Sequence, residues 1–201
     1  MTTVLSPRSR RLVRWAALPV AVLASGVIVS TASYSAFTSS TDNTGNAWSA
    51  GAISLADDDS GAAMFAAEDL QPGSTGENCI AITSDGSLES DIRLYTDNAA
   101  QEQGLDQYLQ LEIVQGAGGG YGSCEDFVPA ASGATVYSGT LAALASAAVD
   151  HASGVGSWAS AGGGEERVFK VSYTLTDDAP NTVQGGSATV DLVWEGRTAT
   201  S

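Results

Sequence analysis

Residues 48–95 read WSAGAISLADDDSGAAMFAAEDLQPGSTGENCIAITSDGSLESDIRLY, and this stretch decides the fold class. Short apolar runs alternate in it with clusters of Asp, Ser, Gly and Pro, which is typical of half-buried strands joined by turns. Tight turns are expected at 71–73 and 84–87, where Pro fixes φ and Gly supplies a positive φ. The pattern predicts four strands: Trp48–Leu55, Met64–Leu70, Cys79–Thr83 and Asp91–Tyr95.

The rest of the chain adds further strands and one helix. Strands are expected at 109–113, 167–176 and 187–195, where apolar and polar residues alternate. The alternation predicts one apolar face in each of the last two: Phe169, Val171, Tyr173 and Leu175, and Ala188, Val190, Leu192 and Trp194. Residues 136–141 lead into the one helical segment, Ala142–Val149. Thr140 is its expected cap, and one apolar face is formed by Leu141, Leu144, Ala145 and Ala148.

The remaining segments read as loops. A polar loop is expected at 96–104, and a loop of small residues at 152–166, in which Trp158 covers an edge of the core. The Gly-rich loop (residues 116–122) has no Lys-Ser/Thr ending and no helix directly after it, so we interpret it as a flexible loop and not as a phosphate site. About eight short strands and one inserted helix predict an all-β, jelly-roll-like antiparallel sandwich.

The charge of the chain excludes some classes of partner. The formal net charge is −15, and four of the eight basic residues precede the first acidic residue, Asp42. Residues 36–201 therefore carry four basic against 23 acidic residues, a charge of −19. Such a surface repels nucleic acid and anionic lipid, so we expect no nucleic-acid partner.

The first 35 residues have the layout of an export signal. Arg8–Arg14 form a positive region, Trp15–Ser30 are apolar or small, and small residues follow at 33–36. We predict a signal-peptide helix at 1–35 that a signal peptidase removes, which makes the protein secreted. The alternative is a permanent membrane anchor, and membrane contact is expected only through an uncleaved signal segment.

The two cysteines agree with export. Cys79 and Cys124 are the only ones in the chain. We expect them to form a disulfide in an oxidising compartment, and the alternative is a pair of free buried thiols.

The order of these motifs is similar to that of the TasA/camelysin family of secreted bacterial proteins. The shared motifs are an aromatic before small-Ala-Gly-x-Ile-x-Leu, then Asp-Leu-x-Pro-Gly, an apolar strand, and Asp-Gly-Ser-Leu. The resemblance implies a jelly-roll fold and cleavage between Ser35 and Ala36, with the mature chain beginning at or next to Ala36-Phe37. It divides the chain into a signal (1–35), an extension (36–47), a jelly-roll domain (48–196) and a tail (197–201).

The resemblance also implies a function. TasA-like proteins form extracellular matrix fibres in which the segment after the cleavage site adds a strand to the next subunit. Residues 36–47 are then the candidate donor strand, with Phe37 as the apolar plug and Trp48 marking the entry into the subunit's own fold. The expected partner is a second copy in a head-to-tail polymer.

Enzymatic chemistry is not predicted. Camelysin-type proteins are described as metallo-endopeptidases, but a His-Glu-x-x-His zinc site needs two histidines and the chain has only His151. We expect His151 to be a solvated residue near a helix C-terminus. No Gly-x-Ser-x-Gly motif is present, and no cofactor is expected. The alternatives to a fibre subunit are a secreted peptidase and a monomeric acidic surface protein.

One acidic cluster is a candidate cation site. Asp57, Asp58 and Asp59 are three adjacent carboxylates in a turn, and Ca²⁺ binds oxygen ligands. Dedicated calcium loops place their acids at alternate positions so that they converge, whereas these are consecutive. We therefore expect a solvated turn, with calcium binding as the alternative.

Overall fold

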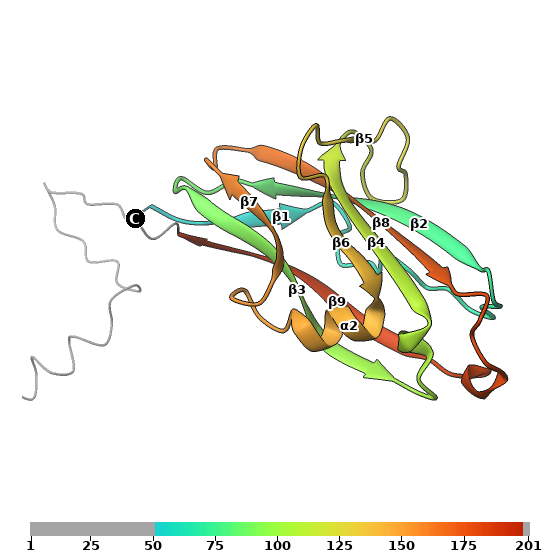
Figure 1. The fold of residues 1–201 in the computed structure, drawn as a ribbon. Helices are drawn as coiled ribbons and strands as arrows, with labels where there is room; N and C mark the ends of the chain where they lie inside the picture. The colour runs from blue at the N-terminus through green and yellow to red at the C-terminus, as the bar shows by residue number, and fades with distance from the viewer. Residues whose placement is uncertain (1–50, 199–201) are drawn as a thin grey trace, which may run out of the picture. The chain divides into compact units, whose positions relative to one another are not determined.

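The computed structural model of the chain describes residues 51–198 (Figure 1). The described elements belong to one compact unit that begins at Ala50. In chain order they are β1 Leu55–Asp57, β2 Thr75–Ser84, β3 Ser90–Gln101, η1 Leu105–Gln107, β4 Leu109–Ala117, β5 Val128–Pro129, β6 Thr135–Thr140, α2 Leu141–Ala147, β7 Val155–Ser160, β8 Glu165–Leu175, η2 Asn181–Val183 and β9 Ala188–Thr198.

The strands form two antiparallel sheets packed as a sandwich, which confirms the predicted fold class at this level. The large sheet has the order β1-β2-β8-β4-β5, with β6 also paired to β4. The small sheet has the order β7-β3-β9. The chain changes sheets between β2 and β3, between β3 and β4, between β6 and β7, between β7 and β8, and between β8 and β9, so most pairings join distant segments (Figure 1).

The core lies between the two sheets because each strand turns its apolar positions inward. The predicted face of β8 is confirmed: Phe169, Val171 and Leu175 are at most 4% exposed. Tyr173, on the same face, is half-buried. The other main contributors are Ile80 and Ile82 from β2, Ile92 and Leu94 from β3, Leu111 and Ile113 from β4, and Trp158 from β7.

Two of the predicted strands at the start of this region are wrong in extent. Of the run Trp48–Leu55, residues 48–50 lie outside the described part, and residues 51–54 are not assigned to a strand. Pairing with β2 begins only at Leu55. The predicted strand Met64–Leu70 is irregular, because its backbone is held by side chains and has no neighbouring ladder.

Two predicted loops are strands instead. β3 continues through the expected loop 96–104 as far as Gln101, because β9 provides a partner up to the pair Gln101↔Ala188. The expected loop 152–166 contains β7, and Trp158 in that strand is 1% exposed. Trp158 therefore lies inside the core and does not cover its edge.

The helix and its cap agree closely with the sequence. The Thr140 side chain accepts a hydrogen bond from the Ala143 N–H at 3.1 Å. Leu141, Leu144 and Ala148 are buried as expected, and Ala145 is half-buried. The helix ends at Ala147, two residues before the predicted end.

The last strand extends beyond the domain boundary expected at residue 196. Arg197 and Thr198 lie in β9 and pair with Asp91 and Ser90 of β3. The first two residues of the predicted tail are therefore part of the small sheet.

A polar contact joins the two sheets at one end of the core. The Trp158 indole on β7 donates to Glu165 Oε1 on β8 at 2.8 Å, and the Ala161 N–H donates to Oε2 at 3.0 Å. Arg167 lies over the Trp158 ring at 4.9 Å. The hydrogen bond from Trp158 is the main cause that holds the pKa of Glu165 below its usual value.

The Glu165→Gln variant is expected to be less stable than the wild type by about 1 kcal/mol near neutral pH, because a charge-assisted hydrogen bond is lost at a partly exposed site. Folding lowers the pKa of Glu165, so its contribution is present above the unfolded-state pKa of about 4.3 and is lost as pH falls through the folded-state value. Urea unfolding of both proteins at about pH 7 and about pH 3 measures this.

Glu166→Gln provides the matched control, since Glu166 is exposed and its carboxylate makes no hydrogen bond within residues 51–198. Its unfolding free energy is expected to equal that of the wild type at both pH values. A Glu165→Gln difference that stays the same in acid would contradict the assignment.

Candidate functional site

The small sheet has an open edge at β9. This strand pairs with β3 along its length, and within residues 51–198 it has no partner on its other side. The free side of this 11-residue strand presents a row of N–H and C=O groups that another strand can join.

A deep groove lies beside this open edge. Its volume is about 1640 Å³. One wall is β9, another is the inner face of the large sheet, and a third is residues 61–72, which we call the strap. The apolar residues that β9 and the large sheet contribute include Val190, Leu192, Trp194, Ile80, Val171 and Tyr173.

The groove leaves the apolar face of β9 only partly covered. Val190, Leu192 and Trp194 pack against the core but remain half-buried, whereas the apolar residues that β3 turns to the core, Ile92 and Leu94, are at most 2% exposed. The sandwich is therefore filled on the β3 side and incomplete on the β9 side.

Trp194 adds one polar group to this wall. Its ring packs against Phe169 with centroids 5.3 Å apart, and its Nε1–H is buried without an acceptor within residues 51–198. Buried donors in folded proteins are normally paired.

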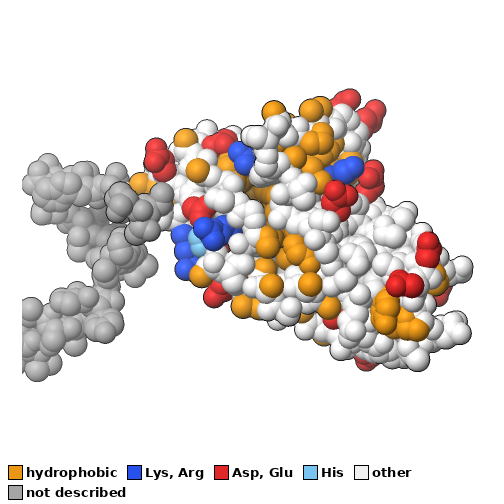
Figure 2. Space-filling view, in the orientation of Figure 1, with side chains coloured by type: hydrophobic (Ala, Val, Ile, Leu, Met, Phe, Trp, Pro, Cys, Tyr) orange, Lys and Arg blue, Asp and Glu red, His pale blue; other side chains and the backbone are white. Residues whose placement is uncertain are grey.

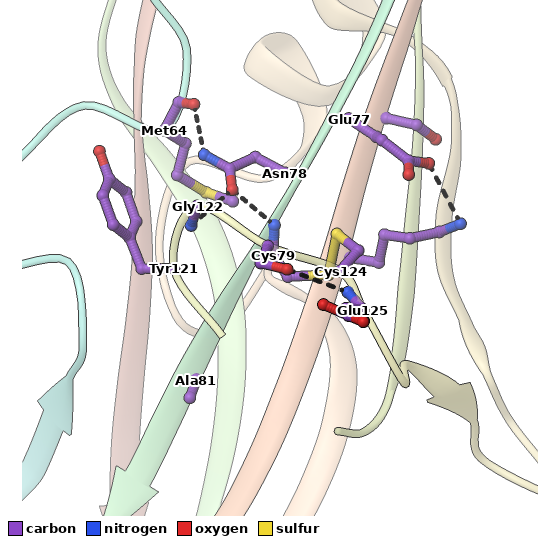
Figure 3. The surroundings of a disulfide bond; sticks show 12 residues. Met64, Glu77, Asn78, Cys79, Ala81, Tyr121, Gly122, Cys124 and Glu125 are labelled. Atoms are coloured by element: carbon purple, nitrogen blue, oxygen red, sulfur yellow. Dashed lines mark hydrogen bonds and ion pairs between the residues drawn. A yellow bond between two sulfur atoms is a disulfide. The ribbon is translucent and has the colours of Figure 1, made fainter. Parts of the chain in front are cut away.

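The strap is attached to the large sheet. The Tyr121 hydroxyl donates to the Ala63 carbonyl at 2.8 Å, and Asn78 Nδ2 donates to the Met64 carbonyl at 2.7 Å (Figure 3). Phe65 packs edge-on against Tyr173, with ring centroids 5.2 Å apart. The strap thus follows the β2 side of the groove and does not pair with β9.

In contrast to β9, the outer edge of β2 is covered. The predicted disulfide Cys79–Cys124 is confirmed, with a Cα–Cα distance of 5.3 Å, and it ties the chain after the Gly-rich loop to β2 (Figure 3). Tyr121 of this loop forms an isolated parallel bridge with Cys79. The loop that we interpreted as simply flexible is therefore anchored and protects a sheet edge.

The Asn78 side chain completes this anchor. Its Oδ1 accepts hydrogen bonds from the Cys79 N–H at 2.8 Å and the Gly122 N–H at 2.9 Å, while its Nδ2 holds the strap (Figure 3). One amide thus joins β2, the Gly-rich loop and the strap.

Two of the three candidate calcium residues, Asp58 and Asp59, accept hydrogen bonds from the main chain. Asp58 accepts hydrogen bonds from the Ala81 N–H at 2.9 Å and the Tyr121 N–H at 2.7 Å, and Asp59 Oδ1 accepts from the Gly61 N–H at 2.6 Å. Burial, followed by the neighbouring Asp59 carboxylate, raises the pKa of Asp57. Within residues 51–198, no three Asp, Glu, His or Cys side chains are grouped to hold a metal ion.

His151 is not solvated, which corrects our expectation. It follows α2 but is only 8% exposed, because its Nε2 lies 2.9 Å from the Asp91 carbonyl oxygen on β3. Figure 2 shows this histidine in pale blue beside blue basic side chains. Its contact with a main-chain carbonyl fixes the turn after the helix against the small sheet.

The predicted cleavage site and donor residues lie outside the described part of the chain. These are Ser35, Ala36, Phe37 and Trp48. In the part that is described, no helix is long and apolar enough to cross a membrane.

No protein-family model matches the chain, and no curated protein matches it. The likeness to the TasA/camelysin family therefore rests on the order of sequence motifs given above.

The sequence predicted the apolar face of β9 but not the groove beside it. The shared apolar face of Ala188, Val190, Leu192 and Trp194 was predicted from alternation, whereas the open edge of β9 was not. No local signal marks an edge strand here, because Thr189 and Asp191 are the polar residues expected on the solvent face of any outer strand.

Proposed function

We propose that this protein is an extracellular structural subunit that forms a head-to-tail polymer by strand donation. In this proposal, residues 36–47 of one subunit add a strand to β9 of the next and cover its groove. The observation that supports the proposal is the combination of an 11-residue edge strand, open on one side within residues 51–198, with a partly apolar groove beside it. Strand addition to such an edge supplies main-chain hydrogen bonds, and a neighbouring groove supplies apolar contact.

The strand pairing supports a jelly-roll architecture that lacks one strand. A jelly roll has eight strands in which the second pairs with the seventh, the third with the sixth and the fourth with the fifth, while the first lies beside the eighth. If β9 is the eighth strand, then β8, β7 and β6 are the seventh, sixth and fifth, and β2, β3 and β4 are the second, third and fourth. The observed pairs β2–β8, β3–β7 and β4–β6 then match this order. The missing position is the one beside β9, which is where the donor would lie.

The direction of the chain favours a donor from a second copy. The described part begins beside the end of β9, since a Cβ on Gly196 would lie 3.1 Å from Ile53 Cγ2. A segment of the same chain that reached this point along β9 would run parallel to it, whereas every ladder between the described strands is antiparallel. A donor from a neighbouring subunit can run antiparallel without reversing.

Charge and the disulfide fit an extracellular site of action. Disulfides persist in oxidising compartments, and the charge of −19 over residues 36–201 keeps an exported protein soluble. Figure 2 shows acidic side chains at many points on the visible face. A donor that is nearly uncharged, with Asp42 as its only charged residue, can approach this surface without strong repulsion.

A comparison of two chains tests the proposal. The chain that begins at Ala36 is expected to form filaments, and the chain that begins at Trp48 is expected to stay monomeric. The chain that begins at Trp48 is expected to stay folded, because both sheets and the disulfide lie within residues 51–198. Negative-stain microscopy and size-exclusion chromatography measure assembly, and urea unfolding measures stability.

Phe37→Ala in the longer chain separates the apolar plug from the backbone contribution. Removing a phenyl ring from an apolar site weakens the contact by about 3 kcal/mol, so the concentration needed for assembly is expected to rise by roughly a hundredfold. Filaments from the chain that begins at Trp48 would overturn the donor assignment.

A further inference from the structure

The strap has a free central part that faces the groove. Within the described residues, none of residues 65–70 makes a main-chain hydrogen bond. Residues 66–69 are exposed, and Asp69 has a φ of +52°. The strap is bound before this part through Ala63 and Met64, as described, and after it through the Gln71 N–H, which donates to Ser74 Oγ at 2.9 Å; Phe65 also packs against Tyr173.

The strap also runs in the direction that pairing with β9 requires. Near its start, Met64 is bound to Asn78, which lies opposite Val171 of β8, two residues from the Phe169 that packs against Trp194 of β9. Just after its end, the Gly73 N–H donates to the Leu175 carbonyl at 2.7 Å. Leu175 belongs to the same apolar cluster as Ala188, the first residue of β9. The strap is therefore antiparallel to β9, and both line one groove.

We propose that the strap is a gate, which in the free subunit closes onto β9 as a strand and which an incoming donor displaces. Only the displacement of the strap by a donor rests on the proposed function; its closure onto β9 does not. In the closed position, residues 65–70 pair with residues 188–194 and complete the sandwich within one chain. The open position is the one described above, with the strap on the β2 side of the groove.

Two physical arguments favour the gate. An open strand edge beside an apolar groove is a risk for unspecific association, so a subunit that must travel before it assembles benefits from covering it. The strap is polar-rich at its centre, with Glu68 and Asp69, and buries little apolar area there, so a donor with stronger contacts can replace it. The fraction of open subunits then sets the apparent affinity for the donor.

Hydrogen exchange in the chain that begins at Trp48 tests the gate without any donor. Alternate amides of β9 point away from β3, and these are the informative ones. A closed strap predicts that they exchange at least about a hundredfold more slowly than freely exposed amides. Exchange of these amides at the rate of freely exposed amides would overturn the proposal.

Two proline variants supply a matched pair. Ala66 and Ala67 are both exposed and make no main-chain hydrogen bond in the open position, so Pro removes nothing there. In a closed strand only one of the two N–H groups points to β9. One of Ala66→Pro and Ala67→Pro is therefore expected to reduce the protection of the outward β9 amides at least about tenfold, and the other to leave it unchanged.

The outcomes separate the gate from the donor. Protection that neither proline variant changes would overturn the gate, since another segment would then cover β9. If a proline variant fails to fold, the wild-type exchange pattern still decides. In the chain that begins at Ala36, the variant that opens the gate is expected to assemble faster, while a failure of that chain to form filaments would count against the donor and not against the gate.

Discussion

The double variant Cys79→Ala, Cys124→Ala is expected to be less stable than the wild type by about 4 kcal/mol. The disulfide closes a loop with a sequence separation of 45 residues, and the loop-entropy relation gives this value for a loop of that length. For a domain of this size, the midpoint of thermal unfolding is expected to fall by about 8 to 16 °C. Denaturant unfolding and a thermal melt measure the two quantities.

The native contacts around the bond are expected to survive this change. The Gly-rich loop keeps the hydrogen bonds from its Tyr121 and Gly122 N–H groups to Asp58 and Asn78. The effect therefore arises mainly in the unfolded chain, which becomes free to expand. The dependence of the unfolding free energy on denaturant is accordingly expected to become steeper.

Reduction of the wild-type protein provides the control. A thiol reductant is expected to lower the wild-type stability to that of the double variant and to leave the variant unchanged. Tyr121→Phe removes only the hydrogen bond to the Ala63 carbonyl and is expected to cost about 1 kcal/mol. A double variant within about 1 kcal/mol of the wild type would show that the bond adds little.

The sequence predicted those strands whose apolar residues alternate strictly. The segments 109–113, 167–176 and 187–195 lie in strands of the structure except for Thr176 and Ser187, because a pleated strand buries every second side chain. β7 was missed, since Trp158 is the only large apolar residue near its centre and the neighbouring Gly and Ser residues resemble a loop. Its strand state depends on pairing with β3, which is a long-range contact.

The strap is the opposite case. Its residues 64–70 were predicted to form a strand, yet they are irregular in the structure, where Asn78 and Tyr121 bind the main chain at Met64 and Ala63. Those two side chains come from distant parts of the sequence, so no pattern within residues 64–70 could predict these contacts. The open edge of β9 was unpredictable for the same reason, since an edge is defined by which strands are absent from its side.

A charge placed in the groove is expected to abolish assembly without unfolding the subunit. Val190 lines the groove from β9 and is half-buried. In a Val190→Lys chain that begins at Ala36, the ammonium group can reach water while the groove is open, but it would be buried without a partner beneath a bound donor strand. We expect no filaments, and an unfolding free energy within about 2 kcal/mol of the wild type.

Val193→Lys is the matched control for charge. Val193 lies three residues after Val190 on the same strand, so its side chain points to the opposite face, and it does not line the groove. This variant introduces the same charge on the same strand and is expected to form filaments as the wild type does. Filaments from both lysine variants would show that the donor does not bind in the groove.

Mixing two defective chains gives the most specific result. Val190→Lys retains a donor and lacks an acceptor, whereas the chain that begins at Trp48 retains an acceptor and lacks a donor. Each is expected to be monomeric alone, and the mixture is expected to contain a one-to-one dimer by size-exclusion chromatography. A head-to-tail contact does not close on itself, so growth must stop after one contact when each chain supplies only one half of it. A mixture that remains monomeric would show that the donor segment does not bind in the groove, and would contradict the proposed polymer.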